Sequence, residues 1–267
     1  MLCARVLSFE CRFFGKYLYL ASTLVLAFLK GGRMRQFERF IRLVGEDNYN
    51  KIKSKKILVI GLGGVGGYSV ISLIRSGIED ITIVDYDVID ISNLNRQIIT
   101  NVKNIGMKKT DVMEEEILKV NPECKIKKID MKVSENNYQE LFADSNYDYV
   151  IDACDTVRVK KELIRYCTSH KIKIISCMGA GKKLDPSKLE ITDIRKTSYD
   201  PICKSIRKFV KDNKIKEKIP VVYSKESPWN TGNVIGSFCP VVACAGMYLS
   251  SYVLNDIIKG ESNDDRD

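Results

Sequence analysis

The sequence predicts an α/β fold with a doubly wound, mostly parallel sheet and a small appended C-terminal α+β region. From residue 57 onward, short runs rich in β-branched residues alternate with amphipathic stretches, the pattern of strands joined by crossover helices. The chain has 267 residues, 45% of them apolar, so it can bury a substantial core. These two observations exclude a disordered chain.

The expected elements alternate regularly as far as Gly181 and less regularly after it. The expected strands are 57–60, 81–84, 125–133, 149–151, 172–176, 189–194 and 221–223. The expected helices are 68–76, 108–119, 137–144, 157–170, 201–210 and 236–258. The weaker alternation after Gly181 is the reason for expecting an appended region there.

The first 33 residues differ from the rest. Residues 17–29 are apolar and follow basic residues, as in a signal peptide, but they lack a cleavage pattern and are too short to span a bilayer. Lys-Gly-Gly at 30–32 can be encoded by a purine-rich ribosome-binding sequence just before Met34. We therefore expect 1–33 to be a non-native extension and translation to start at Met34. A membrane-directing segment is the alternative.

Charge and cysteine content limit the partners and the compartment. Lys and Arg number 43 against 34 acids, a net charge of +9, which favours a polyanionic partner over a basic one. The nine cysteines include no Cys-x-x-Cys pair, which argues against a disulfide framework and a paired-knuckle zinc site. We expect a cytoplasmic protein without zinc. Membrane association is the alternative, because residues 238–253 carry no charge.

A glycine-rich turn carries the first binding motif. It follows an expected strand, opens an expected helix, and precedes an acid, Asp85, at the end of the next strand. The glycines are Gly61, Gly63, Gly64 and Gly66. Glycine permits a tight turn, and the helix N-terminus offers free N–H groups to phosphate oxygens. This Rossmann-like arrangement predicts a bound nucleotide, with a glycine-rich packing turn as the alternative.

The residues beyond the second strand favour ATP over NAD. An NAD enzyme needs only a ribose-binding acid there, whereas this chain adds Asp87, Asn93 and Arg96. An arginine suits phosphates. Lys109 begins the next helix within reach of a triphosphate, and Asp155 follows the fourth strand with a carboxylate suited to Mg²⁺.

Together these motifs resemble the E1-like adenylating enzymes, which activate carboxylates with ATP. The motifs are Gly-x-Gly-Gly-x-Gly at 61–66, Asp85-x-Asp87, Asn93-x-Asn95-Arg96-Gln97, Lys109 and Asp152-x-x-Asp155. The resemblance implies that Asp85, with Asp87 beside it, binds the ribose side of ATP. It implies that Asn93, Arg96 and Lys109 bind the phosphates and that Asp155 holds Mg²⁺. Asn95 and Gln97 are expected to hold the loop.

The same resemblance implies a homodimer with shared active sites. In this superfamily an arginine of the partner subunit reaches ATP, and the matching position here is Arg42. Arg96, Lys109, Asp155 and Arg42 are therefore the expected catalytic residues. A solvated helix face is the alternative for Arg42, and Arg39 is the competing arginine.

The second half resembles one branch of the superfamily, the tRNA threonylcarbamoyladenosine dehydratases. The matching motifs are Gly179-Ala180-Gly181, Leu184-Asp185-Pro186, Ile191-Thr192-Asp193-Ile194, Lys196-Thr197 and Asp200-Pro201. This branch implies adenylation of the carboxylate of N6-threonylcarbamoyladenosine in tRNA, followed by cyclising dehydration. The alternatives are adenylation of a sulfur-carrier protein, with Cys203 as a nucleophile, and an inactive nucleotide-binding scaffold. The resemblance leaves open a sulfur-transfer partner protein.

Residues 182–218 concentrate positive charge, with twelve Lys or Arg against six acids. That density suits contacts with the phosphate backbone of tRNA, and a solvated face is the equal alternative. Trp229 is expected either to stack on a base or to pack its loop, and His170 to end a helix. The expected organisation is an extension at 1–33, an ATP-binding domain at 34–181, a basic tRNA-facing region at 182–235, an apolar helix at 236–260 and a polar tail at 261–267.

Overall fold

The computed structural model describes residues 35–143, 146–229, 232 and 235–260. The expected start at Met34 and the polar tail at 261–267 lie outside these residues. The chain divides into two compact units, one ending at Leu43 and one beginning at Val44, and each is described by itself. The described part of the first unit holds a 3-10 helix, Arg35–Phe37, and most of α2 (Glu38–Val44).

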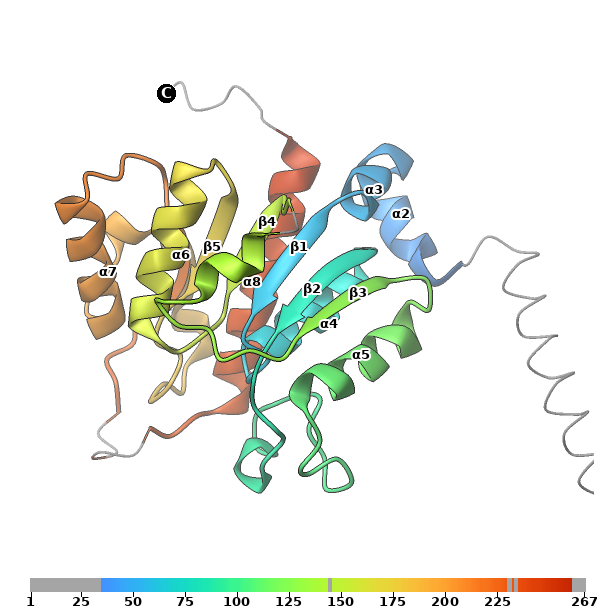
Figure 1. Cartoon of the computed structure of the whole chain (residues 1–267), viewed down its shortest axis with the longest axis horizontal. Helices are drawn as coiled ribbons and strands as arrows, with labels where there is room; N and C mark the ends of the chain where they lie inside the picture. Colours follow the sequence, from blue (N-terminus) through green and yellow to red (C-terminus); the bar gives the residue numbers. More distant parts are fainter. Residues whose placement is uncertain (1–34, 144–145, 230–231, 233–234, 261–267) are drawn as a thin grey trace, which may run out of the picture. The chain divides into compact units, whose positions relative to one another are not determined.

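The second unit is built on one seven-stranded sheet (Figure 1), with strand order β3-β2-β1-β4-β5-β7-β6. The strands are β1 (Lys56–Ile60), β2 (Asp80–Val84), β3 (Lys125–Ile129), β4 (Tyr149–Asp152), β5 (Lys173–Cys177), β6 (Leu189–Asp193) and β7 (Pro220–Ser224). All neighbouring strands are parallel except β6, which runs antiparallel to β7. The predicted α/β fold with a mostly parallel sheet is confirmed, and its C-terminal strands extend the edge of that sheet.

Helices cover both faces of the sheet. They are α3 (Glu46–Lys53), α4 (Gly66–Arg75), α5 (Lys109–Val120), α6 (Val157–Ser169), α7 (Pro201–Asp212) and α8 (Cys239–Lys259). Short 3-10 turns lie at η2 (Ile91–Asn93), η3 (Tyr138–Phe142), η4 (Pro186–Lys188) and η5 (Ile194–Lys196). Helix α4 packs with α5 and α8, whereas α6 packs with α7 on the other face (Figure 1).

Two expected elements differ from the structure. The strand expected at 125–133 ends at Ile129, because its partner β2 ends at Val84, which pairs with Ile129. The helix expected at 137–144 is the 3-10 turn η3. The Asn137 side chain accepts a bond from the Ser134 amide behind it and does not cap the first turn, so a longer helix lacks its start signal.

The apolar helix α8 packs into the core. It contacts α4 and crosses β5, β6 and β7. It packs tightly at Gly246, where a Cβ atom would clash with the carbonyl oxygen of Val65. By length and composition α8 is the one helix among the described residues that could cross a membrane, yet half of its apolar window is buried inside the fold.

Candidate active site

The expected binding motifs meet at one edge of the sheet. Strands β1 and β4 are neighbours whose connections leave in opposite directions, and such a switch point opens a crevice at the carboxyl ends of the strands. The glycine turn follows β1, Asp85 follows β2, and Asp155 follows β4. We call this side of the sheet the nucleotide edge.

The glycine turn is shaped by two positions that exclude a side chain. Gly61 has φ 91°, and a Cβ there would lie 2.9 Å from the carbonyl oxygen of Ala153. A Cβ on Gly66 would lie 1.8 Å from the carbonyl oxygen of Gly61. Helix α4 then begins at Gly66 without a side-chain cap. The Gly67 amide bonds back to the carbonyl of Gly63 at 3.0 Å, and the positive end of the helix dipole at this turn favours an anion.

Asp85, Asp87 and Lys109 form a charged cluster beside the turn. Asp85 accepts hydrogen bonds from the Leu62 amide (2.7 Å) and the Asp87 amide (2.9 Å), which ties β2 to the glycine turn. The Lys109 ammonium donates to Asp87 at 2.7 Å, lies 3.9 Å from Asp85, and is buried. Each carboxylate oxygen has two lone pairs, so Asp85 keeps acceptor capacity for ribose hydroxyls.

Arg96 lies against the glycine turn. Its Cγ is 3.3 Å from the place where a Cβ on Gly64 would stand, and its guanidinium donates to the carbonyl of Ser92 (2.7 Å) and the amide oxygen of Asn95 (2.9 Å). The Asn93 side chain accepts from the Asp90 amide and closes a capping box around η2. Asn93 therefore organises the loop that carries Arg96, in addition to its expected place at the phosphates.

Gln97 adds a polar atom on the same side of the turn. Its side chain is buried, its Nε2 would be 3.9 Å from a Cβ on Gly63, and its amide oxygen has no hydrogen-bond partner among the described residues. A buried unpaired acceptor costs free energy unless a ligand or water donates to it. This orphaned oxygen fits a bound ligand at the turn.

Asp155 is an exposed carboxylate in the loop after β4. It accepts one bond, at 3.2 Å, from the Thr156 hydroxyl. The pKa of Tyr86 is raised chiefly by the negative charge of Asp87, then by burial, and then by Asp155 and Asp85, so the charges of all three carboxylates act on this phenol. No three acidic, Cys or His side chains among the described residues are close enough to hold a metal alone. Mg²⁺ needs only one or two carboxylates when phosphates supply the other oxygens, so Asp155 fits.

Comparison with known proteins identifies the family. Residues 35–251 match the ThiF family. The chain belongs to that family. It is 39% identical over 195 residues to the tRNA threonylcarbamoyladenosine dehydratase of Bacillus subtilis (strain 168), covering 73% of this chain and 76% of the relative. The dehydratase of Escherichia coli (strain K12) is 37% identical over 210 residues, covering 75% and 78%. The resemblance to the dehydratase branch is confirmed.

A solved ThiF-like structure shares the fold. The crystal structure of the E. coli dehydratase TcdA in complex with ATP superposes with a TM-score of 0.79 at 34% sequence identity. The match covers 84% of this chain and 94% of that chain. Another crystal structure of the same protein holds AMP.

This ThiF-family chain also buries an ion pair that sequence reasoning missed. Lys160 on α6 and Asp152 at the end of β4 are both buried, and the ammonium lies 3.0 and 3.1 Å from the two carboxylate oxygens. Burial is the largest single influence on the pKa of Lys160 and would lower it. The charge of Asp152, two nearby cysteines and the hydrogen bond to Asp152 together outweigh burial, so the pKa is raised. Lys160 therefore stays protonated at neutral pH. The sequence did hold a signal for this pair: Lys160 lies three residues before Leu163, on the apolar stripe of α6, where a lysine needs a buried partner.

Asp152 also shapes the loop that carries Asp155. The same carboxylate accepts a bond from the Cys154 amide at 3.2 Å and contacts the Cys154 thiol at 3.0 Å. Ala153, between them, packs against Gly61. Asp152 is thus bonded within the protein. Of the two acids in the motif, only Asp155 is exposed.

Three other residues singled out in the sequence lie elsewhere. Arg42 is in α2 of the first unit, where its largely exposed guanidinium pairs with Glu38. Cys203 is fully buried at the start of α7. Burial, followed by the charge of Asp200, raises the pKa of its thiol to about 12. His170 ends α6 and stacks on Tyr166 with ring centroids 3.9 Å apart.

Proposed function

We propose that this chain is an ATP-dependent tRNA threonylcarbamoyladenosine dehydratase. It adenylates the carboxylate of N6-threonylcarbamoyladenosine in tRNA and then closes the side chain into the cyclic form. The observation that carries the proposal is the complete charged set at the nucleotide edge, in a chain 39% identical to a dehydratase.

ATP supplies the leaving group that a carboxylate lacks. A carboxylate oxygen attacks the α-phosphorus, the bond to the β-phosphate oxygen breaks, and pyrophosphate leaves. An internal nucleophile of the same side chain then attacks the activated carbonyl, loses its proton, and displaces AMP. The net change in the substrate is the loss of one water. Both steps are favoured by holding the reacting groups in place and by neutralising developing negative charge.

Each part of the nucleotide edge has a role in this proposal. The N–H groups of the glycine turn and the start of α4 bind phosphate oxygens, and Asp85 binds the ribose. Lys109 and Arg96 offset the charge that develops as pyrophosphate leaves. Asp155 would hold Mg²⁺, which would add positive charge at the phosphates. Arg42 contributes from the partner subunit, so the active enzyme is a homodimer.

The burial of Cys203 favours the dehydratase over a thioester-forming enzyme. Ring closure is intramolecular and needs no protein thiol. A nucleophilic cysteine is activated by a lowered pKa or an adjacent base, whereas the Cys203 thiol is buried and its pKa is raised. The seven described cysteines are free thiols, which supports a reducing, cytoplasmic location.

The function is tested on tRNA directly. Purified protein is incubated with ATP, Mg²⁺ and tRNA carrying threonylcarbamoyladenosine, and the nucleosides are analysed by mass spectrometry. We expect a nucleoside lighter by one water and the release of AMP and pyrophosphate. Unchanged tRNA, together with ATP–pyrophosphate exchange stimulated by a sulfur-carrier protein, would support the alternative instead.

A further inference from the structure

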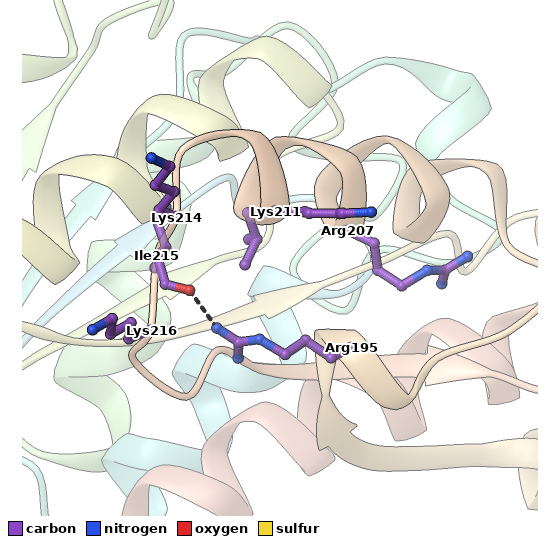
Figure 2. Close-up of a pocket in the computed structure, with 7 residues that line it drawn as sticks. Arg195, Arg207, Lys211, Lys214, Ile215 and Lys216 are labelled. Carbon is purple, nitrogen blue, oxygen red and sulfur yellow. Dashed lines mark hydrogen bonds between the residues drawn. The ribbon is translucent and has the colours of Figure 1, made fainter.

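A basic hollow lies at the C-terminal end of α7 (Figure 2). Its volume is about 600 Å³, and no acidic residue lines it. Five of the seven lining residues are cationic and the other two form an apolar floor. The lining residues are Arg195, Arg207, Lys211, Lys214, Lys216, Val210 and Ile215.

The two arginines of the hollow are held in place by backbone carbonyls. Arg195 donates to the carbonyls of Ile215 (2.6 Å) and Glu217 (3.0 Å), and it pairs with Asp193 at 2.9 Å. Arg207 donates to the carbonyl of Thr197 at 2.9 Å. Within the part of the chain that the structure describes, Arg195 pairs with a carboxylate and Arg207 does not. Fixed guanidiniums suit phosphate, because less freedom is lost when an anion binds.

The three lysines of the hollow are presented by the turn that ends α7. All three are exposed, and their ammonium groups have no ion-pair partner among the described residues. Lys214 has φ 54°, in the left-handed region where helix ends usually place glycine. The Ile215 amide bonds back to the carbonyl of Val210 and closes this turn.

The exposed face of α7 links the hollow to the nucleotide edge. Lys204, Lys208 and Lys211 are spaced at i, i+4 and i+7, so they lie on one side of the helix. Like charges at this spacing destabilise a helix unless an anion neutralises them. We call these lysines and the hollow together the α7 basic surface.

Topology gives the direction of the α7 basic surface. Helix α7 begins next to the loop after β5, since a Cβ on Gly179 would lie 2.5 Å from the Asp200 carboxylate. It ends near the start of β7, which is parallel to β5. Twelve residues at about 1.5 Å each give a length of about 18 Å. The surface therefore runs from the nucleotide edge toward the opposite edge of the sheet.

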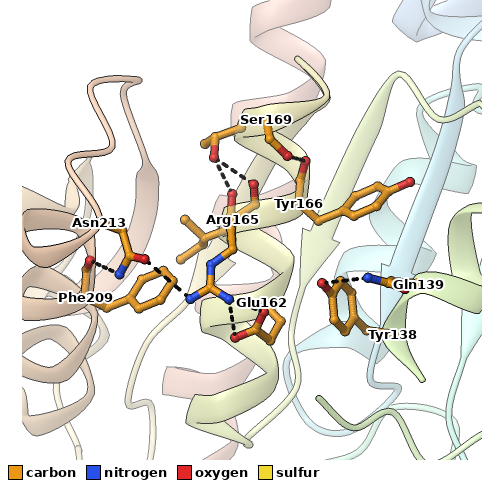
Figure 3. Close-up of polar contacts among 10 residues, drawn as sticks. Tyr138, Gln139, Glu162, Arg165, Tyr166, Ser169, Phe209 and Asn213 are labelled. Atoms are coloured by element: carbon orange, nitrogen blue, oxygen red, sulfur yellow. Dashed lines mark hydrogen bonds and ion pairs between the residues drawn. The ribbon is translucent and has the colours of Figure 1, made fainter. Parts of the chain in front are cut away.

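The opposite side of α7 is anchored to the fold. Cys203, Ile206 and Phe209 are buried against α6. Figure 3 shows Arg165 of α6 between Glu162 and Asn213, bonded to them at 2.8 and 3.5 Å, with its guanidinium 5.0 Å from the Phe209 ring. Arg165 is thus used within the fold, whereas the lysines of α7 point to solvent on a rigid support.

We propose that the α7 basic surface binds the phosphate backbone of the RNA substrate at a distance from the reacting nucleoside. Lys204, Lys208 and Lys211 extend over about 10 Å of α7, and the cations of the hollow continue the line. Such a line matches a polymer with regularly repeated negative charge better than it matches a single small anion. The proposal rests on the proposed function, and it assigns substrate affinity to α7 and chemistry to the nucleotide edge.

Charge-neutralising variants test this division. In Lys211→Gln/Lys214→Gln/Lys216→Gln, we expect KM for tRNA to rise by at least about tenfold while kcat at saturating tRNA and the Kd for ATP stay unchanged. Each lost phosphate contact should reduce the slope of log Kd against log salt by about one. The matched control is Lys51→Gln/Lys125→Gln/Lys127→Gln, which removes the same charge from exposed lysines on α3 and β3. Its KM and salt dependence should equal those of the unaltered protein.

Three outcomes overturn the proposal. The first is that the triple Lys→Gln variant of the hollow folds but has unaltered KM for tRNA and an unaltered salt slope. The second is equal loss of tRNA affinity in the control variant, which would mean that net charge alone is responsible. The third is that the same triple variant loses binding to phosphatidylserine vesicles but keeps its affinity for tRNA. If the unaltered protein does not convert tRNA at all, the proposed function fails, and direct binding of an anticodon stem–loop RNA still tests the α7 basic surface.

Discussion

The nucleotide edge and the α7 basic surface differ in how their lysines are held. At the nucleotide edge Lys109 and Lys160 are buried, and each ammonium lies within 3.0 Å of a carboxylate oxygen. On α7 the lysines are exposed and without acid partners among the described residues. Charge that must act at one atom is fixed by the fold before a substrate arrives, because preorganisation avoids a cost at the moment of reaction. Charge that follows a backbone needs density more than fixed geometry.

The buried pair gives the largest expected effect. In Lys160→Met the Asp152 carboxylate is left buried without a partner, so unfolding free energy should fall by about 3–5 kcal/mol. Chemical denaturation at pH 7 measures this loss. The matched control is Lys119→Met, which removes a lysine from an exposed pair with Glu116 and should have no measurable effect.

A second variant separates lost charge pairing from lost packing. Asp152→Leu/Lys160→Met removes both charges, and its stability should lie closer to that of the unaltered protein than that of the single variant does. A single variant as stable as the unaltered protein would show that the buried pair is not an ionic anchor of the nucleotide edge.

Removing the exposed Asp155 carboxylate or the half-buried Arg96 guanidinium from the nucleotide edge should impair catalysis far more than stability. Asp155→Ala and Arg96→Ala should each lower turnover by at least about two decades, since each removes a preorganised charge at the departing pyrophosphate. The rate of AMP release with saturating tRNA measures the effect. Glu123→Ala, an exposed acid before β3, is the control and should retain full activity. Near-normal turnover in Asp155→Ala would remove Asp155 from the metal site.

Complementation tests whether one subunit holds a complete nucleotide edge. If Arg42 acts on the partner's ATP, homodimers of Arg42→Ala and of Asp155→Ala should both be nearly inactive. Mixing and reassembling them creates one intact site in each heterodimer. Random exchange places about half of the subunits in heterodimers, so about a quarter of the sites should recover. Absence of recovery in demonstrably mixed dimers would assign Arg42 a role within its own subunit or none, and Arg39 would be tested next.

The sequence was most informative where local pattern and burial coincide. Central strands such as β1 are continuous apolar runs because both faces are covered, and their bounds were predicted within one residue. The glycine turn was also predictable, because Gly61 and Gly66 occupy positions that no side chain can enter. The end of β3 depends on where its neighbour stops, which local pattern does not record.

Long-range partners were the part that the sequence did not disclose. Lys160 is a charged residue at an apolar position of its helix, and only the fold shows that Asp152 lies opposite it. The density of cations at 182–218 was visible in the sequence. The sequence did not show which of these cations are bonded within the fold and which are exposed. Arg195 is bound to backbone carbonyls and Asp193, whereas Lys211 and Lys214 remain exposed.

The smallest expected effect concerns Cys203, which lies on α7 yet faces the core. Because burial and Asp200 raise the pKa of its thiol to about 12, the group stays protonated at pH 8 and is shielded from solvent. Cys203→Ser should therefore keep kcat within about twofold, with at most a modest loss of stability from burying a hydroxyl. In the unaltered protein, Cys203 should resist alkylation at pH 8 until denaturant is added, as peptide mass analysis can measure. Loss of all turnover in a folded Cys203→Ser would place covalent chemistry on α7, and the division between a catalytic edge and a binding helix would no longer hold.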